Sequence, residues 1–184
     1  MNILDIGSHN GKTKSPTYKY TLNSKYNVFH VEPNPHMYED LEKLNSTLVK
    51  TGVSDYNGKG KLYFDKKGFN SRQKGVKINK KKGMRNSLMN DNEYINSFLT
   101  SDFVEVDIMT LDKLVCTLEL TEIEILKIDT EGLDYKILNG YSWSVYPKKI
   151  ITEDFSETVA SKWELLLCAG YTLEKNNTSD SEWV

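Results

Sequence analysis

The sequence predicts an α/β fold built on a mostly parallel sheet. Short apolar segments typical of strands alternate along the chain with segments whose apolar residues recur at helical spacing. Residues 123–128 are the most apolar strand segment, and such continuous apolar character is typical of the buried centre of a parallel sheet. Residues 1–184 are therefore expected to form a single domain, a length that one hydrophobic core can stabilise.

Strands are expected at residues 2–6, 26–32, 47–53, 61–64, 103–106, 123–128, 149–153 and 171–174. Helices are expected to begin at residues 16 and 35 and to span residues 111–118, 133–139 and 157–169. Ser15-Pro16 and Asn34-Pro35 each place a capping side chain before a proline that suits the first helical position. Thr110 is expected to cap the helix that follows it.

Residues 65–101 show no sustained periodicity and are expected to form a basic insertion or long loop. Residues 57–86 hold eleven lysines and arginines against one acid, Asp65, within a chain of net charge −2. Such a segment suits either a surface for an anionic partner or a solvated loop. Its role is left open between these two.

Composition excludes some classes of protein. No apolar run is long enough to span a membrane, and the N-terminus lacks the features of a secretory signal. Cys116 and Cys168 lie in apolar surroundings without the spacing of metal ligands. Both are expected to be core thiols in a reducing compartment, which predicts a cytoplasmic location. Trp143, Trp163 and Trp183 are expected to pack in the core or at its edge.

Polar residues and glycines follow four of the predicted strands. Ligands of a doubly wound sheet bind outside the carboxyl ends of its strands. Glu32 is placed to accept hydrogen bonds from both hydroxyls of a ribose, and residues 53–55 lie near the expected adenine edge. The predicted nucleoside-binding residues are Asp5, Gly7, Ser8, His9, Gly11, Glu32, Pro33, Val53, Ser54, Asp55 and Asp129.

The loop after the first strand favours S-adenosylmethionine over NAD. The spacing of Gly7 and Gly11 departs from the GxGxxG pattern that holds a pyrophosphate, and Pro16 prevents one unbroken helix from running on from Gly11. Asp5 beside this loop disfavours a phosphate and favours a cation. S-adenosylmethionine carries an ammonium and a sulfonium but no phosphate.

Several motifs carry a resemblance to a known family: Leu4–Gly11, Val31–Pro35, Gly52–Asp55, Asn86-Ser87-Leu88, Thr110-Leu111-Asp112, Leu126–Gly132 and Ile137–Gly140. Together they resemble the FkbM family of methyltransferases, and the Lys-Ile-Asp-x-Glu-Gly run is the most specific. The resemblance implies a Rossmann-like class I methyltransferase fold, whose seven-stranded, mostly parallel sheet has helices on both faces and an antiparallel C-terminal strand. It also implies S-adenosylmethionine as cofactor and O-methylation of a sugar, glycan or natural-product hydroxyl.

The sequence departs from this family in two respects. It starts directly at its first strand, whereas family members usually have preceding residues that help to close the pocket. We therefore expect one domain of a larger multidomain polypeptide, or a substrate cover supplied by another chain. The lysine-rich segment is also longer than expected and suggests an anionic or nucleotide-linked glycan as partner.

The predicted catalytic residues are Asp129, Glu131 and Glu153. Methyl transfer needs alignment and exclusion of water, and a sugar hydroxyl benefits from a carboxylate that accepts its proton. Asp129 is expected to hold the methionine amino group or the acceptor, Glu131 to act as base or orienting group, and Glu153 to assist. Glu131 could instead cap the following helix. An acidic cluster including Asp134 could hold Mg²⁺, although no metal is expected.

Three other functions are considered. An RNA ribose 2′-O-methyltransferase would use a Lys-Asp-Lys-Glu set, for which Lys14, Asp129, Lys149 and Glu153 supply the residue types, but the last two lie too close in sequence. Nucleic acid is accordingly disfavoured as a partner. A non-catalytic glycan- or nucleic-acid-binding module would need none of the acidic residues at the strand ends. An NAD enzyme is disfavoured by the first loop.

Overall fold

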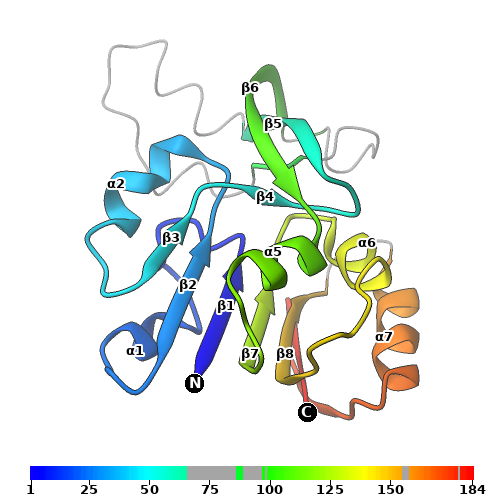
Figure 1. The fold of residues 1–184 in the computed structure, drawn as a ribbon. Coiled ribbons are helices and arrows are strands. Elements are labelled where there is room, and N and C mark those ends of the chain that lie inside the picture. The colour runs from blue at the N-terminus through cyan, green and yellow to red at the C-terminus, as the bar shows by residue number, and fades with distance from the viewer. Residues whose placement is uncertain (66–85, 89–96, 98, 155–157, 178) are drawn as a thin grey trace.

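The computed structural model describes residues 1–65, 86–88, 97, 99–154, 158–177 and 179–184. Its larger sheet comprises β1 (Asn2–Ile6), β2 (Asn27–Val31), β3 (Thr47–Val49), β7 (Ile123–Ile128), β8 (Pro147–Glu153), β9 (Leu173–Asn176) and β10 (Asp180–Trp183). These seven strands lie in the order β3-β2-β1-β7-β8-β10-β9 (Figure 1). The strands from β3 to β8 pair in parallel, and β10 runs antiparallel to β8 and β9. The predicted fold class is confirmed.

Helices cover both faces of this sheet. The described helices are α1 (Tyr18–Thr21), η1 (Pro35–Met37), α2 (Tyr38–Leu41), α5 (Leu111–Thr117), α6 (Asp134–Asn139) and α7 (Val159–Cys168). The face that presents Leu4 and Leu126 packs against α5, α6 and α7 in the main core. The opposite face presents Ile3 and Val28 toward Tyr20 of α1. None of the helices that the structure describes is long and apolar enough to cross a membrane.

A second sheet lies where β1, β2 and β7 end (Figure 1). It comprises β4 (Gly52–Val53), β5 (Gly58–Asp65) and β6 (Leu99–Met109), in the order β4-β6-β5. The single strand predicted at 47–53 is therefore wrong, because the chain turns at Thr51 and divides the segment between the two sheets. The Thr51 hydroxyl donates to the carbonyl oxygen of Asp107 and so ties this turn to β6.

Several element boundaries differ from the prediction. The first helix begins at Tyr18 rather than at residue 16, since Thr17 is held against the sheet by a hydrogen bond from its hydroxyl to Asp5. β5 and β6 extend well beyond 61–64 and 103–106, so β6 occupies the end of the predicted loop at 65–101, and most of the rest of that loop lies outside the described residues. β10 has a polar sequence that did not suggest a strand.

Local predictions at caps and apolar side chains had mixed outcomes. Asn34 accepts a hydrogen bond from the N–H of His36, and Thr110 accepts one from Lys113, which confirms both caps. Cys116 and Cys168 are exposed, so their assignment to the core was wrong: both lie on outward-facing positions of α5 and α7. The tryptophans pack as predicted.

We expect β10 to be essential for stability through Trp183. This side chain is fully buried, meets Trp163 edge-on at 5.6 Å, and donates a hydrogen bond to Ser181. Trp183→Ala should lower the free energy of unfolding by about 3–5 kcal/mol through cavity formation. The exposed Leu173 on neighbouring β9 is the control, and Leu173→Ala should change that free energy by less than about 0.5 kcal/mol. Urea denaturation measures both, and equal losses would contradict this expectation.

Candidate active site

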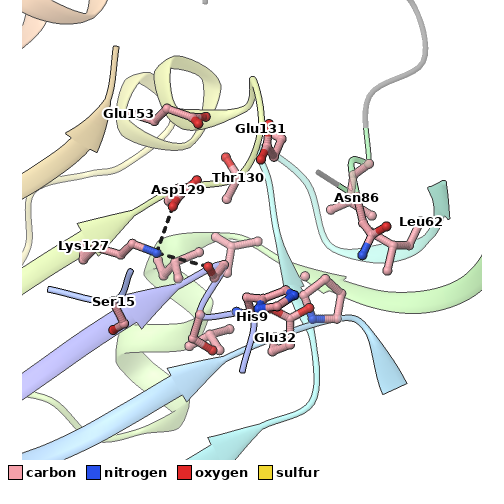
Figure 2. A pocket seen from close by; sticks show the side chains of 18 of the residues that line it. His9, Ser15, Glu32, Leu62, Asn86, Lys127, Asp129, Thr130, Glu131 and Glu153 are labelled. Atoms are coloured by element: carbon pink, nitrogen blue, oxygen red, sulfur yellow. Dashed lines mark hydrogen bonds and ion pairs between the residues drawn. The ribbon is translucent and has the colours of Figure 1, made fainter. Parts of the chain in front are cut away.

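A cavity of about 960 Å³ opens where strands of both sheets meet (Figure 2). Nine of the predicted site residues line it: Gly7, Ser8, His9, Glu32, Pro33, Val53, Asp129, Glu131 and Glu153. Four do not: Asp5, Gly11, Ser54 and Asp55. Asp5 lies buried below the cavity, and Gly11 lies against Leu41 and Leu44. Ser54 and Asp55 follow β4, where the hydroxyl of the buried Ser54 donates to the Asp55 carboxylate.

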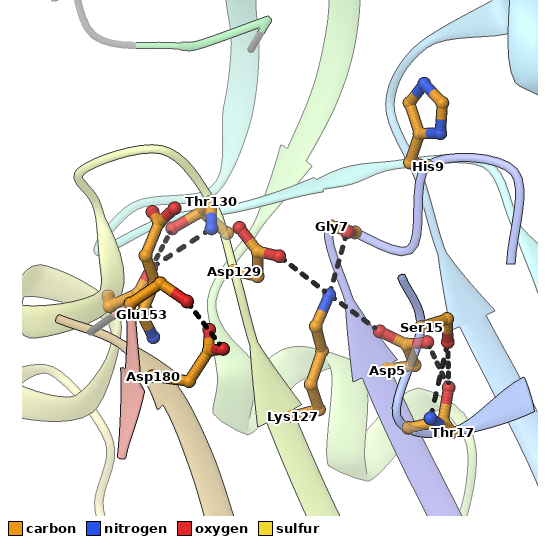
Figure 3. Close-up of polar contacts among 12 residues, drawn as sticks. Asp5, Gly7, His9, Ser15, Thr17, Lys127, Asp129, Thr130, Glu153 and Asp180 are labelled. Atoms are coloured by element: carbon orange, nitrogen blue, oxygen red, sulfur yellow. Dashed lines mark hydrogen bonds and ion pairs between the residues drawn. The ribbon is translucent and has the colours of Figure 1, made fainter. Parts of the chain in front are cut away.

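Lys127 joins the ends of β1 and β7 below the cavity. Its ammonium lies 3.2 Å from Oδ1 of Asp5 and 3.3 Å from Oδ2 of Asp129, and it donates to the carbonyl oxygen of Gly7 at 3.1 Å (Figure 3). Burial alone would lower the pKa of Lys127, but the charges of Asp129 and Asp5 raise it above its usual range. Three N–H groups thus meet three oxygens.

Asp5 supports the site from beneath. Burial alone would raise the pKa of Asp5, but Lys127, followed by His30 and Thr17, brings it well below its usual range. The Asp5 charge is therefore balanced inside the protein, and the carboxylate that faces the cavity at this point is Asp129. The sequence analysis missed Lys127, although a lysine inside a buried strand segment requires a partner and could have been noticed for that reason.

The loop after β1 approaches β7 so closely that only glycine fits at position 7. Gly7 has a φ of +73°, and a Cβ atom built on it would lie 1.9 Å from the carbonyl oxygen of Asp129. A side chain here would force the two strand ends apart. Gly7 therefore lines the cavity with backbone atoms alone.

Glu32 lies at the end of β2 with both carboxylate oxygens in use. Oε2 accepts the N–H of His9 at 2.7 Å, and Oε1 accepts the N–H of Asn34 at 2.9 Å. Burial raises the pKa of Glu32 to about 7, and the two backbone N–H groups offset that rise only in part. Burial disfavours the charged form of His9 too, and for this basic group it lowers the pKa. The His9 ring at the cavity wall is therefore neutral at physiological pH.

Three carboxyl groups meet on the side of the cavity away from Glu32 (Figure 2). An oxygen from each of Asp129, Glu131 and Glu153 lies within 4.8 Å of the other two. Burial, followed by the charges of Asp129 and Glu131, raises the pKa of Glu153 far above its usual range, so it holds a proton at neutral pH. Neighbouring charges at this spacing favour the protonated form of one carboxyl group, and oxygen atoms are also the ligands that Mg²⁺ prefers.

Asp134 does not join these three carboxyl groups. Its Oδ1 accepts the N–H and the hydroxyl of Thr130, and its Oδ2 accepts the N–H of Glu153. Helix α6 begins after Leu133 with no side-chain hydrogen bond at its cap, so in the described part of the chain Glu131 does not serve as that cap. The side chain of Glu131 lines the cavity instead.

Further walls come from segments that the sequence analysis did not assign to the site: Thr13, Lys14 and Ser15, Leu62 and Asp65 of β5, Asn86 and Leu88, and Ser179 and Asp180 beside β10. Ser87 links one of these segments to the acidic residues, because its hydroxyl donates to the carbonyl oxygen of Glu131 at 3.1 Å. Thr13, Lys14 and Ser15 belong to the loop between β1 and α1. The other segments approach through the second sheet and the C-terminal hairpin, whose pairing no local pattern revealed.

Residues 5–172 match the Methyltransferase FkbM domain. The chain belongs to this family. A structurally similar protein is the methyltransferase FkbM from Methylobacillus flagellatus KT, at 11% identity with a TM-score of 0.59; the match covers all of this chain and 43% of that one. This FkbM domain therefore spans less than half of that protein's length, and the likeness shows a shared fold.

A second similar structure is the precorrin-6y C5,15-methyltransferase from Geobacter metallireducens GS-15. It is 13% identical, has a TM-score of 0.48, and is matched over all of this chain and 76% of its own. No curated protein matches the chain.

Family membership implies a methyltransferase that uses S-adenosylmethionine, and the cavity fits that cofactor. Glu32 would meet the ribose hydroxyls of a bound S-adenosylmethionine, and Pro33 and Val53 would provide apolar walls for its adenine ring. The absence of a side chain at Gly7 would allow close approach of the methionine part, and Asp129 would offer a carboxylate to its ammonium.

The buried ammonium should govern both stability and donor binding in this FkbM domain. Lys127→Met leaves Asp5 buried without its main counter-charge and should cost about 3–5 kcal/mol of unfolding free energy, with weaker binding of S-adenosylhomocysteine. Adding Asp5→Asn removes the fully buried unpaired charge, while Asp129 remains at the cavity wall, and the double variant should regain much of that stability. Denaturation measures the unfolding free energy, and calorimetry measures the binding of S-adenosylhomocysteine. Lys127→Met as stable as the wild type would contradict the structural role of Lys127.

Donor affinity should rise with pH up to about pH 7. The ribose hydroxyls bond better to an ionised carboxylate, whereas Glu32 with a pKa of about 7 is protonated at lower pH. Binding of S-adenosylhomocysteine should therefore release a proton, and its affinity should fall up to about tenfold per pH unit below pH 7. Calorimetry between about pH 5 and pH 8, in buffers of different ionisation enthalpy, measures both. Glu32→Gln should bind weakly with little pH dependence; a flat wild-type profile would refute this role.

Proposed function

We propose that this domain transfers a methyl group from S-adenosylmethionine to a hydroxyl oxygen of a sugar or glycan. The observation that supports it is the meeting of Asp129, Glu131 and Glu153 on the side of the cavity opposite Glu32 (Figure 2). An alcohol is a weak nucleophile, so its methylation benefits from a group that removes its proton. Carboxyl groups beside the expected position of the methyl group can supply that help.

The neighbours of the three carboxyl groups favour Glu131 as the base. Asp129 is paired with Lys127, and Glu153 already holds a proton at neutral pH. Neither group is therefore as well suited as Glu131 to accept the proton of the acceptor hydroxyl. Glu131 has a φ of +53°, a conformation that costs energy in a residue other than glycine and needs surrounding contacts to persist. The hydrogen bond from Ser87 to its carbonyl oxygen is one such contact.

The reaction follows from these roles. The bound donor supplies a methyl group already activated by its sulfonium. Asp129 and the loop at Gly7 orient the donor, while Glu131 accepts the hydroxyl proton as the acceptor oxygen bonds to the methyl carbon and the carbon–sulfur bond breaks. Leu62 and Leu88 also line the cavity and help to exclude water. The products are a methyl ether, S-adenosylhomocysteine and a protonated Glu131.

The charges of the described walls favour a neutral acceptor. Five carboxyl groups line the cavity besides Glu32, at Asp65, Asp129, Glu131, Glu153 and Asp180, against two lysines, Lys14 and Lys127. An anionic group beside them would be repelled. The anionic or nucleotide-linked glycan suggested by the lysine-rich segment remains an alternative acceptor, since most of that segment lies outside the described residues.

The set of residues for RNA ribose methylation is not assembled in the cavity. Lys14, Asp129 and Glu153 line it, but Lys149 is held by Glu174 and Glu182 at 2.6 and 2.5 Å on the outer strands of the sheet. This arrangement favours a sugar or glycan acceptor over RNA.

Methyl transfer from tritiated S-adenosylmethionine to neutral, amino and phosphorylated glycosides, and to RNA, tests the proposal. We expect incorporation into a glycoside, and Glu131→Gln should lower kcat at least about 100-fold while affinity for S-adenosylhomocysteine stays within about twofold. Glu119→Gln is a matched control, because Glu119 has the same φ of +53° and is exposed after α5. Incorporation into RNA alone would refute the acceptor class, and unchanged kcat would remove Glu131 from the mechanism.

A further inference from the structure

Two buried charged side chains hold the backbone of Glu153 from opposite sides. Oδ2 of Asp134, at the start of α6, accepts the N–H of Glu153 at 3.1 Å. The ammonium of Lys162, on α7, donates to the carbonyl oxygen of the same residue. Asp134 is 3% exposed and Lys162 is fully buried, and neither is among the residues that line the cavity. We call this pair the Asp134–Lys162 clamp.

The clamp also reaches the segment that carries the other two carboxyl groups. Oδ1 of Asp134 accepts both the N–H of Thr130, at 3.1 Å, and its hydroxyl, at 2.6 Å. Thr130 lies between Asp129 and Glu131 in the chain, so one carboxylate ties the end of β7 to the end of β8. Lys162 continues the connection with an ion pair of 3.1 Å to Asp154.

Carboxyl groups that converge in this way need an external restraint. Like charges within a few ångströms of one another repel strongly in a partly desolvated site. The proton on Glu153 lowers that repulsion, but its carboxyl group could still leave its place beside Asp129 and Glu131 by two routes. The first is rotation of its side chain, and the second is movement of its backbone, which would separate the two strand ends. Fixing the N–H and the carbonyl oxygen of one residue removes the second route.

Packing alone does not explain the two charges. Taking an ammonium and a carboxylate out of water is unfavourable, and apolar residues of similar volume often stabilise a protein as well or better. Here most of the hydrogen bonds of the pair go to the backbone beside the three carboxyl groups, at Glu153 and Thr130. The desolvation cost of Asp134 and Lys162 is explained if these two residues keep the three carboxyl groups in place.

We infer that Asp134 and Lys162 are positioning residues for methyl transfer, which set Glu153 against Asp129 and Glu131 without touching donor or acceptor. The inference rests on the proposed function, since it assumes that these carboxyl groups serve the acceptor hydroxyl. It predicts an effect on turnover that is separate from any effect on donor binding.

Asp134→Asn and Lys162→Met test it. The amide keeps the size of Asp134 but offers only one acceptor oxygen for two backbone segments, and methionine keeps the apolar stem of Lys162 without its N–H groups. Each should lower kcat at least about tenfold with the KM for S-adenosylmethionine and the affinity for S-adenosylhomocysteine within about twofold. Lys148→Met is the control, because Lys148 lies on β8, the strand that ends at Glu153, but is exposed and pairs with Glu124. This substitution should leave kcat unchanged.

A double-mutant cycle with Glu153→Gln separates positioning from stability. If the clamp acts through Glu153, adding Asp134→Asn to Glu153→Gln should lower kcat by much less than it does in the wild type. Full additivity in kcat, or equal losses of kcat and donor affinity, would overturn the inference. Should Lys162→Met not fold, Asp134→Asn and this cycle decide the matter alone.

The wild-type protein distinguishes the two proposals. Binding of S-adenosylhomocysteine without methyl transfer to any glycoside would refute the proposed function, and the inference with it. Transfer by the wild type together with undiminished kcat in both clamp variants would refute the inference and leave the proposed function intact.

Discussion

One buried ammonium fixes the geometry on which the cavity depends. Lys127 meets Asp5, Asp129 and the carbonyl oxygen of Gly7, and so ties the ends of two adjacent parallel strands to each other. Without it, two carboxylates would face each other in a partly buried space, and the glycine loop would lose the group that holds its backbone against β7. The close contact at Gly7 then follows, because strands held at this distance leave no room for a Cβ atom.

The two halves of the cavity are organised in different ways. On the proposed donor side, backbone N–H groups fix Glu32, and burial together with those groups decides its protonation. On the proposed acceptor side, three carboxyl groups lie close together, and hydrogen bonds to the backbone of Glu131 and Glu153 hold the segments that carry two of them. Affinity for the donor and rate of transfer should accordingly respond to different substitutions, which is the separation that the Asp134–Lys162 clamp implies.

The sequence predicted those features that local pattern determines. The apolar strands of the larger sheet, the caps at Asn34 and Thr110, and the polar strand ends all follow from the residues themselves. Features that depend on contacts between distant segments were missed: the division at Thr51, the polar strand β10 and the cavity walls from β5. Lys127 was missed because its role depends on register, since it pairs with Asp5 only once β7 lies beside β1.

The proposed reaction is consistent with the balance of charge in this enclosed space. A base that takes up a proton loses its negative charge, and in the proposed transfer the sulfonium loses its positive charge in the same event. The two opposite charges therefore cancel as the transfer proceeds, and a partly desolvated site favours such a step because separated charges are poorly stabilised there. A carboxylate suits that exchange better than a neutral imidazole, which would become a cation. Glu131, rather than the neutral and largely buried His9, is therefore the group whose charge complements the donor.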